Sequence, residues 1–442
     1  MAKKMLFLFV LLLSLTGMLK AQVTTAGMSG KVMADEESVI GATVVAVHEP
    51  SGTSYGTVTN VDGRFSLQGM RSGGPYKVTV SYIGYQTAIY TGIQLQLGET
   101  YSLNVTLHEA SELLGEITIT ASKSKFSAEK TGATTNISSE QLTTLPSINR
   151  SISDFTRISP YASGNSFGGR DGRSNTFTVD GANLNNNFGL SSGLPGGGNP
   201  ISLDAIDEVQ VVIAPYDVRQ ANFIGAGINA ITKSGTNAYR GSAYMYFNNE
   251  VMRGNKIGDT DFGARAEESK TVYGATFGGP IIKDKLFFFA NVEYEKSPQQ
   301  VITWRAAKEG ETPNNSTISR TTEADLAEFS QILKDKYGYN TGSFTDFPAD
   351  VTNLKLLGRI DWNINQGNKL SVRYNFTNNK TWEAPNGSSG NTGYRLAYNR
   401  VSAYSMSYAN SCYSLQNIVN SATAELNSRF SSNISNQLLF TY

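Results

Sequence analysis

The C-terminal half of the chain constrains the fold most, because apolar and polar residues alternate there over segments of about ten residues. In residues 354–365 the apolar positions are Leu354, Leu356, Gly358, Ile360, Trp362 and Ile364, and the polar ones are Lys355, Arg359, Asp361 and Asn363. A period of two predicts β-strands rather than helices. The segments with this pattern are residues 239–248, 271–279, 286–296, 354–365, 369–380, 417–429 and 434–442.

Long and short connections alternate between these segments. The long ones are residues 249–270, 297–353 and 381–416, and the short ones are residues 280–285, 366–368 and 430–433. This rhythm is typical of a transmembrane β-barrel with extracellular loops and periplasmic turns. The second long connection is predicted to hold a helix over residues 323–337, capped by Thr322 and Asp325 and ended by Gly338. Candidates for aromatic girdles are Tyr244, Tyr246, Tyr273, Tyr294, Trp362 and Tyr374.

The N-terminus carries an export signal. Lys3 and Lys4 precede an apolar run over residues 5–15, and Ala21 follows as a small residue at a cleavage point. This order predicts a cleaved signal peptide over residues 1–21, with an uncleaved anchor as the alternative. No other stretch reaches the ~18 apolar residues that a spanning helix needs. A mature protein in the membrane would therefore span it as a β-barrel.

The charge composition excludes some classes of function. Lys plus Arg number 37, as do Asp plus Glu, so nothing indicates a nucleic-acid-binding surface. Charged residues make up only 17%, with 43 glycines and 10% aromatic residues. This balance suits membrane strands and their loops, although a soluble β-sandwich protein also shows it. A single cysteine, Cys412, excludes a disulfide within this chain.

Three short strands are predicted between these two ends of the chain, over residues 177–179, 206–214 and 226–233. They lie in the sequences FTVDG, IDEVQVVIAP and GAGINAITK. In this order they resemble three landmarks of the plug domain of TonB-dependent outer-membrane receptors, in the Oar-like branch. The resemblance covers nearly the whole chain. The alternative is a glycine-rich secreted β-domain in which these motifs occur by chance.

The resemblance implies a plug domain over residues 136–237. Its motif residues are Arg170, Arg173, Asp180, Gly181, Glu208, Val209, Gly227, Asn229, Thr232 and Lys233. Arg170 and Arg173 are expected to pair with the barrel wall, and a direct ligand role is the alternative. Helices are predicted over residues 138–145 and within residues 145–160, which include Ile148, Ile152 and Phe155. An Asn- and Gly-rich stretch, residues 183–198, is the candidate substrate loop, with Asn183, Asn185, Asn186 and Asn187.

The N-terminal region, residues 22–108, is predicted to be a β-sandwich. Its expected strands are residues 30–33, 42–48, 54–59, 64–68, 76–82, 87–90 and 101–107. The phrases SGKV, IGATVVAV and GTVTNVDGRFSL resemble the carboxypeptidase-regulatory-like domain, which implies a seven-stranded, transthyretin-like sandwich related to carbohydrate-binding folds. His48 and His108 are the only histidines and lie far apart, so we predict no metal site and no catalytic residues.

A polar linker, residues 109–135, joins the sandwich to the plug and contains an isolated β-prone hexapeptide. Its residues are Glu116, Ile117, Thr118, Ile119, Thr120 and Ala121. It resembles a TonB box, which adds a strand to a partner's open sheet edge. The alternatives are that it forms the last strand of the sandwich or the first strand of the plug.

The sequence thus predicts a mainly β chain: signal peptide, β-sandwich, linker, α+β plug, and the first seven strands of an antiparallel transmembrane barrel over residues 238–442. The family uses 22 strands, and even eight would leave room only for side chains. We therefore expect the chain to be an N-terminal fragment, with a small closed barrel as the alternative.

The resemblance implies a function in transport. An outer-membrane receptor of this family takes up an extracellular substrate, here unidentified, when TonB, powered by ExbB–ExbD, displaces the plug. It is not an enzyme and needs no cofactor or metal. The alternatives are a non-transporting structural, adhesive or carbohydrate-binding outer-membrane protein, and an exported enzyme with an accessory sandwich.

Overall fold

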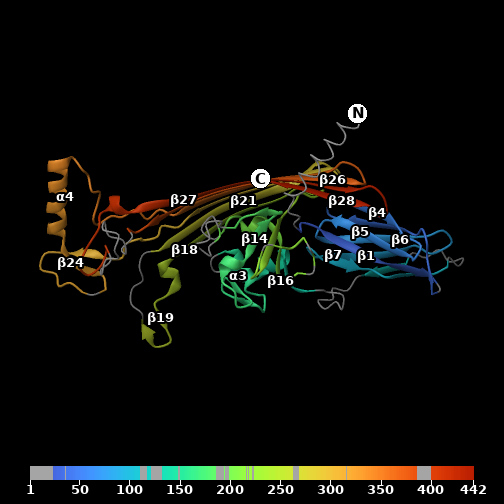
Figure 1. Ribbon diagram of the computed structural model, residues 1–442, viewed down its shortest axis with the longest axis horizontal. Coiled ribbons are helices and arrows are strands. Elements are labelled where there is room, and N and C mark those ends of the chain that lie inside the picture. Colours follow the sequence, from blue (N-terminus) through green and yellow to red (C-terminus); the bar gives the residue numbers. More distant parts are fainter. Residues whose placement is uncertain are drawn as a thin grey trace, which may run out of the picture.

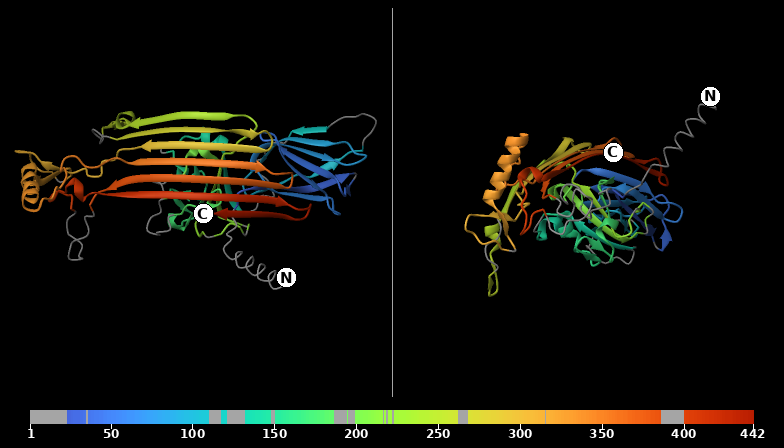
Figure 2. Two further views of the ribbon diagram at one scale, coloured as in Figure 1. Left: turned by 90° about the horizontal axis from the view of Figure 1, so that it is seen from above. Right: turned by 60° about the vertical axis from the view of Figure 1, so that its left-hand side comes forward.

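The computed structural model arranges the chain as a long sheet that arches over two smaller units lying side by side (Figures 1 and 2). One unit is the sandwich, residues 23–109, and the other is the central unit, residues 132–235. The predicted signal peptide and most of the predicted linker lie outside the described residues. The described residues are 23–34, 36–109, 117–120, 132–147, 150–185, 194, 199–215, 217, 219–221, 223–261, 268–314, 316–385 and 400–442.

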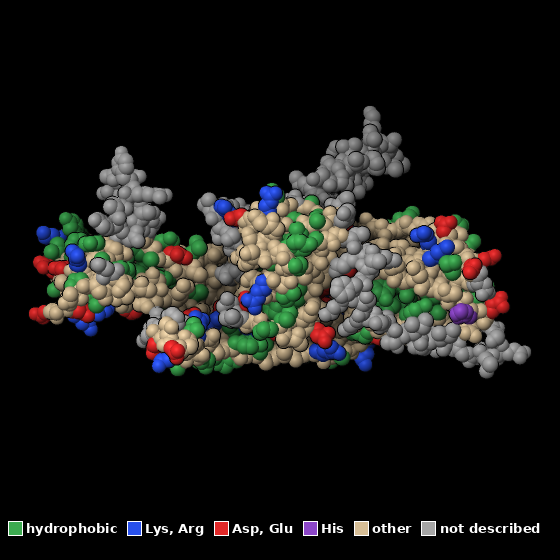
Figure 3. Space-filling model, turned by 90° about the horizontal axis from the view of Figure 1, so that it is seen from below, with side chains coloured by type: hydrophobic (Ala, Val, Ile, Leu, Met, Phe, Trp, Pro, Cys, Tyr) green, Lys and Arg blue, Asp and Glu red, His purple; other side chains and the backbone are tan. Residues whose placement is uncertain are grey.

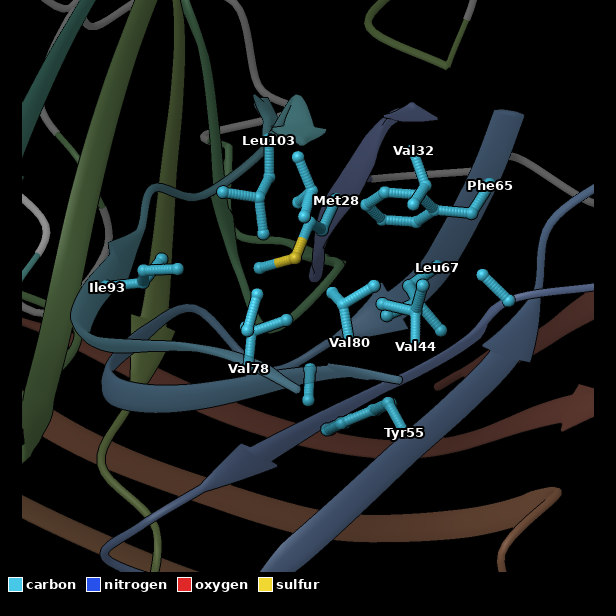
Figure 4. Packing of buried hydrophobic residues seen from close by; sticks show 14 of the residues in the cluster. Met28, Val32, Val44, Tyr55, Phe65, Leu67, Val78, Val80, Ile93 and Leu103 are labelled. Carbon is cyan, nitrogen blue, oxygen red and sulfur yellow. The ribbon is translucent and has the colours of Figure 1, made fainter. Parts of the chain in front are cut away.

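The sandwich packs two antiparallel-rich sheets face to face. One contains β1 (Ala26–Ala34), β2 (Glu37–Ser38), β5 (Arg64–Met70), β8 (Thr100–Ser102) and β9 (Val105–Leu107). The other has the order β10-β7-β6-β3-β4, with β3 (Thr43–His48), β4 (Thr53–Val58), β6 (Gly73–Ser81), β7 (Ala88–Leu95) and β10 (Ile117–Thr120). Met28, Val32 and Leu67 from the first sheet meet Val44 and Val80 from the second, and all are fully buried (Figure 4).

The strand predicted over residues 101–107 is divided into β8 and β9, both of which run parallel to β1. The division lies at Leu103, whose amide donates to Ser29 O of β1 at 2.8 Å. At Gly30 an added Cβ would lie 1.8 Å from Leu103 O, so this close approach requires a glycine in β1. The expected seven strands are supplemented by the short β2 and by β10.

The central unit is built on a sheet with the order β11-β16-β17-β14-β15. Its strands are β11 (Ala133–Ser138), β14 (Thr176–Val179), β15 (Ala182–Asn183), β16 (Ile206–Ala214) and β17 (Gly227–Thr232). A separate antiparallel pair, β12 (Ala162–Ser163) and β13 (Ser166–Phe167), precedes β14 in the chain. The predicted strands correspond to β14, β16 and β17.

Two short helices cover this sheet, and one is shorter than predicted. Helix α2 (Ser139–Thr144) begins at Ser138 with a capping box. Helix α3 (Ile152–Thr156) begins only at Ser151, whose hydroxyl accepts from Ser153 N. Ile152 and Phe155 are buried as expected, whereas Ile148 lies outside the described residues.

The long sheet is antiparallel and follows chain order, β18-β21-β22-β25-β26-β27-β28 (Figure 2). Each strand corresponds to one of the period-two segments. Their bounds are β18 (Arg240–Asn249), β21 (Ser269–Ile282), β22 (Leu286–Lys296), β25 (Thr352–Asn363), β26 (Asn368–Glu383), β27 (Tyr413–Arg429) and β28 (Ser435–Thr441).

The long sheet is polar on its covered face and apolar on its outer face. On β25, Lys355, Arg359 and Asp361 are buried, whereas Ile360 is 48% and Trp362 is 41% exposed. The same alternation continues on β26. Its inward residues are Arg373, Asn375, Thr377 and Asn379, and its outward residues include Val372 and Tyr374. A soluble sheet does the reverse, so this pattern favours an outer face in contact with lipid.

The connection after β22 forms a compact unit at one end of the long sheet (Figure 1). Helix α4 (Glu323–Tyr337) has the predicted bounds, with the capping box of Thr322 and Asp325 and left-handed Gly338 at its C-terminus. The Tyr408 hydroxyl donates to Leu326 O at 2.8 Å and joins α4 to the connection after β26. Within the described residues, none of the helices combines the length and apolarity needed to cross a membrane.

Candidate functional site

The candidate site lies where the central unit meets the long sheet, around Asp180. Asp180 and Gly181 both have positive φ, 49° and 84°, as the tight turn between β14 and β15 requires. An added Cβ at Gly181 would lie 2.7 Å from Leu439 of the long sheet. The Asp180 carboxylate is buried and accepts hydrogen bonds from Thr232 N at 3.0 Å and Thr232 Oγ1 at 2.6 Å.

Two arginines of the long sheet converge on Asp180. Arg359 and Arg373 are partners across β25 and β26. Arg359 Nη1 lies 3.8 Å and Arg373 Nε 3.6 Å from Asp180 Oδ1. Arg359 Nη1 also donates to Thr232 O at 2.6 Å. Buried ion pairs depend on such added hydrogen bonds, because desolvation of the charges is costly. This arrangement fixes one position of the central unit on the sheet.

Further carboxylates complete the charge cluster. Arg359 binds Asp361 through two nitrogens, at 2.8 and 2.9 Å, and Arg373 Nη1 lies 2.9 Å from Glu425 Oε2. Arg71 of the sandwich reaches Asp361 at 3.3 Å. The charges therefore alternate in sign from the sandwich, through the long sheet, to the central unit.

A second cluster lies farther along the same contact. Glu293 pairs with Lys355 at 2.8 Å and accepts from the hydroxyls of Tyr244 and Ser202, each at 2.8 Å. Arg150 of the central unit pairs with Asp204, and its guanidinium lies 3.9 Å from the centre of the Tyr246 ring. Sequence analysis did not single out Arg150 for this role.

A cavity of about 390 Å³ borders this second cluster, between α2, α3 and the strands β18 and β21. Arg150, Asp204 and Lys233 contribute charges to its lining, and Tyr246 and Phe155 contribute aromatic surface. Lys233 is one of the predicted motif residues, and its amide donates to Ala205 O at 2.8 Å.

Neither Arg170 nor Arg173 makes a contact with the strands of the long sheet that the structure describes, so their wall contacts stay a prediction. Arg173 pairs with Asp171 at 2.9 Å, and both side chains are more than half exposed. Asp171 also accepts from Arg173 N, so the pair closes the local turn η1 (Gly172–Ser174). Arg170 is exposed and bridges to Phe167 through its backbone. The arginines that reach across the contact come instead from the long sheet and from Arg150.

Other predicted motif residues hold the central sheet together. Val209 is fully buried, and Asn229 Oδ1 accepts from Thr178 Oγ1 at 2.8 Å. Gly227 opens β17, where an added Cβ would lie 2.7 Å from the Phe223 ring. These contacts assign the residues a structural role in the unit that carries Asp180.

The candidate substrate loop is only partly described. Asn186 and Asn187 lie outside the described residues. Asn185 Oδ1 accepts from Phe177 N at 2.6 Å, and Asn183 Oδ1 accepts from Asn185 N at 2.8 Å. Asn183 is exposed, whereas the Asn185 side chain is bonded to the backbone of β14.

The hexapeptide that resembles a TonB box is described at its centre. Ile117–Thr120 form β10, which pairs in parallel with β7 at the edge of the sandwich sheet. Glu116 and Ala121 lie outside the described residues. The sequence left this pairing with the sandwich open as an alternative.

The histidines have no metal-binding arrangement. His48 is buried, its Nδ1 lies 2.7 Å from Ser51 Oγ, and burial lowers its pKa to about 3. His108 is exposed. In the part of the chain that the structure describes, no group of three His, Cys, Asp or Glu side chains could hold a metal ion. On the face away from the long sheet, basic and acidic side chains are interspersed (Figure 3).

Glu208, a predicted motif residue, is buried where the central unit meets the sandwich. Its Oε1 accepts from Leu97 N at 3.0 Å and from Asn136 Nδ2 at 3.1 Å. Burial, and secondarily the charge of Asp207, raise its pKa to about 8, against the opposing effect of the hydrogen bonds from Leu97 and Asn136. The folded protein therefore holds this proton more tightly than the unfolded chain. The resulting stabilisation is complete below about pH 4.5 and is lost as the pH rises through about 8.

Glu208→Gln should remove this pH dependence, because the amide keeps an oxygen for Leu97 N and cannot ionise. For the unchanged protein, we expect the free energy of unfolding to fall by up to about 1.4 kcal/mol per pH unit between about pH 5 and 8. Thermal unfolding in detergent at several pH values between about 5 and 8 measures this slope. The exposed Glu309→Gln is the control and should retain the slope. An equal slope in Glu208→Gln and the unchanged protein would contradict this assignment.

Asp180→Ala should destabilise the chain by about 3 kcal/mol, because it removes the charge that faces two buried arginines. Equilibrium unfolding of the purified chain in detergent measures this change. Asp171→Ala is the matched control, since it breaks only a solvent-exposed pair with Arg173, which contributes little to stability. Equal effects of the two substitutions would show that Asp180 does not anchor the central unit.

Two family models match the chain. Residues 27–108 match the carboxypeptidase regulatory-like domain, and residues 231–442 match the outer membrane beta barrel domain. The TonB-dependent transporter Oar of Myxococcus xanthus is 25% identical over 344 residues, which cover 73% of this chain and 30% of Oar. The chain thus spans about 30% of the length of this curated relative.

Several solved structures are similar over much of the chain. The ferric enterobactin receptor mutant of Pseudomonas aeruginosa in complex with enterobactin is 14% identical, with a TM-score of 0.45, over 71% of this chain and 41% of the receptor. The siderophore receptor PirA of Acinetobacter baumannii is 18% identical, with a TM-score of 0.38, over 70% of this chain and 47% of PirA. The outer membrane transporter YddB of Escherichia coli is 13% identical, with a TM-score of 0.40, over 67% of this chain and 37% of YddB.

Proposed function

The chain is a homologue of the TonB-dependent transporter Oar with a carboxypeptidase regulatory-like domain and an outer membrane β-barrel domain, and we propose that it serves energy-coupled transport across the outer membrane. The observation that carries this proposal is the buried Asp180–Arg359–Arg373 contact. It holds a small α+β unit against the polar face of a sheet whose outer face is apolar. A plug inside a membrane barrel requires this arrangement.

In this proposal the central unit is the plug and the long sheet is part of the barrel wall. The contact between them is largely polar and charged, so water can replace the lost partners when the plug moves. The apolar outer strands remain in lipid. The role is non-enzymatic, because the substrate crosses without a change in its covalent structure.

The partner in the periplasm would be TonB, driven by ExbB–ExbD, and its binding site would be the peptide Glu116–Ala121. TonB would pair with this peptide by strand addition, which uses backbone hydrogen bonds. In the structure the backbone of β10 already pairs with β7. We therefore propose that β10 separates from the sandwich before TonB binds it.

The substrate would bind on the outer side, at the loop that begins at Asn183 and at the connections that carry α4. The connection that carries α4 lies at one end of the long sheet (Figure 1).

A disulfide between β10 and β7 tests the role of the peptide. Thr118 and Ile89 are partners in the parallel register. Neighbouring strands lie about 4.8 Å apart, which is within the Cα–Cα range that a disulfide can bridge. In a Cys412→Ser background, we expect Thr118→Cys/Ile89→Cys to bind the purified periplasmic domain of TonB when reduced and to lose at least tenfold in affinity when oxidised. Fluorescence anisotropy with labelled TonB measures both affinities.

The control is Thr43→Cys/Val58→Cys, which joins partners of β3 and β4 and leaves β10 unchanged. It should bind TonB equally in both redox states. Failure of the reduced β10 variant and of the unchanged protein to bind would contradict TonB-dependent transport. Equal binding of the reduced and oxidised β10 variants would contradict only the separation of β10 from β7.

A further inference from the structure

A tight loop of the sandwich, residues 96–99, contacts the central unit and is called here the latch loop. Leu97 at its tip is fully buried and packs with Val23 and with Ile231 of β17. Gly98 has a φ of 71°, and an added Cβ would lie 2.8 Å from Gln210 Nε2 and 2.9 Å from Val23 Cγ1. The loop therefore fits against the face of the central sheet with no space left for a side chain at Gly98.

Both backbone groups of Leu97 are bonded to the central unit. Its amide donates to Glu208 Oε1 at 3.0 Å. Its carbonyl accepts from Asn136 Nδ2 at 3.2 Å and from Gln210 Nε2. A buried backbone group that loses such a partner costs more than an exposed one, so these bonds define one docked position of the loop.

Strand β11 completes this contact. Asn136 bridges the Leu97 carbonyl and the Glu208 carboxyl group, and Thr134 Oγ1 donates to Glu99 Oε1 at 3.3 Å. Strand β11 is the edge strand of the central sheet, paired with β16. It is also the next strand that the structure describes after β10 along the chain.

The other side of the sandwich is attached to the long sheet. Arg71 pairs with Asp361 at 3.3 Å, and Asn363 Nδ2 donates to Thr53 Oγ1 at 3.0 Å. Arg429 donates to Gly56 O, and Thr24 Oγ1 donates to Glu425 Oε1 at 2.9 Å. None of these four contacts involves β11, so its removal leaves them in place.

We propose that the sandwich stays bound to the long sheet and holds the plug closed through the latch loop. The loop releases the plug when β11 is withdrawn. A pull on the chain at β10 reaches β11 next. Withdrawal of β11 removes the donors Asn136 and Thr134 and exposes the contact of Leu97 with Glu208 to water. Because the sandwich stays on the wall, the loop can dock again when β11 returns. The proposal rests on the proposed function only in that TonB supplies the pull.

Gly98→Ala tests the latch, since its methyl group collides with Gln210 and Val23. Gly84→Ala is the matched control: Gly84 also lies in a sandwich turn at positive φ, 88°, but an added Cβ meets nothing within 4 Å. Both substitutions impose the same kind of backbone strain, and only the first disturbs the plug. In the full chain in detergent, we expect amides of β11 and β16 to exchange hydrogen about tenfold faster in Gly98→Ala than in Gly84→Ala.

Asn136→Ala provides a second test if Gly98→Ala folds poorly. It removes the bridge between Leu97 and Glu208, with Thr135→Ala on the same strand as its control. The amide of Leu97 should exchange about tenfold faster in Asn136→Ala. Equal exchange in each variant and its control would overturn the latch.

These outcomes are independent of transport. If exchange differs as expected but TonB does not bind the chain, the latch stands and the proposed function fails. If TonB binds but exchange does not differ, the proposed function stands and the latch fails.

Discussion

The arrangement of the chain depends on the contact of the Asp180 carboxylate with two arginines of the long sheet. Neither arginine relies on Asp180 alone, because Arg359 also binds Asp361 and Arg373 also binds Glu425. A buried network of this kind adds little net stability compared with an apolar contact, but it accepts few alternative positions. That combination suits a plug, which must occupy one position when closed and leave it at a moderate cost in free energy.

The two β-structures of the chain follow opposite rules of burial. The sandwich buries Met28, Val44 and Leu67 between its sheets, as a domain in water does. The long sheet buries Lys355 and Arg359 and exposes Trp362. One chain therefore contains a part suited to water and a part suited to lipid. The central unit and the sandwich both pack on the charged, covered face of the long sheet. The same face allows the sandwich to contact the central unit and the long sheet together.

Local patterns predicted much of this structure. The period of two located each strand of the long sheet, and the caps Thr322, Asp325 and Gly338 located α4. Features that depend on distant partners were not predictable in this way. The helix predicted within residues 145–160 is observed as α3, which begins at the local cap Ser151. The split of β8 from β9 depends on the approach of Leu103 to Gly30. The pairing of β10 with β7 depends on the open edge of the sandwich sheet.

In the candidate site, too, contacts between distant residues were not predictable from local sequence patterns. The sequence marked Asp180 and placed Arg359 on a polar face, but a period of two does not say which charges meet across a contact. It also assigned Arg173 to the wall, whereas Asp171, two residues away, was the nearer partner. Glu208 was marked as a motif residue without any indication that it faces the sandwich.

The central claim is that TonB displaces the plug, and labelling of a buried plug residue in cells tests it most directly. Ala230 on β17 is 1% exposed and lies in the sheet that carries Asp180. We would place Ala230→Cys in a Cys412→Ser background and measure its labelling by a membrane-impermeant maleimide in cells with and without TonB. The account predicts several-fold faster labelling when TonB is present, and loss of the difference when the proton gradient is collapsed. Equal labelling with and without TonB would contradict it.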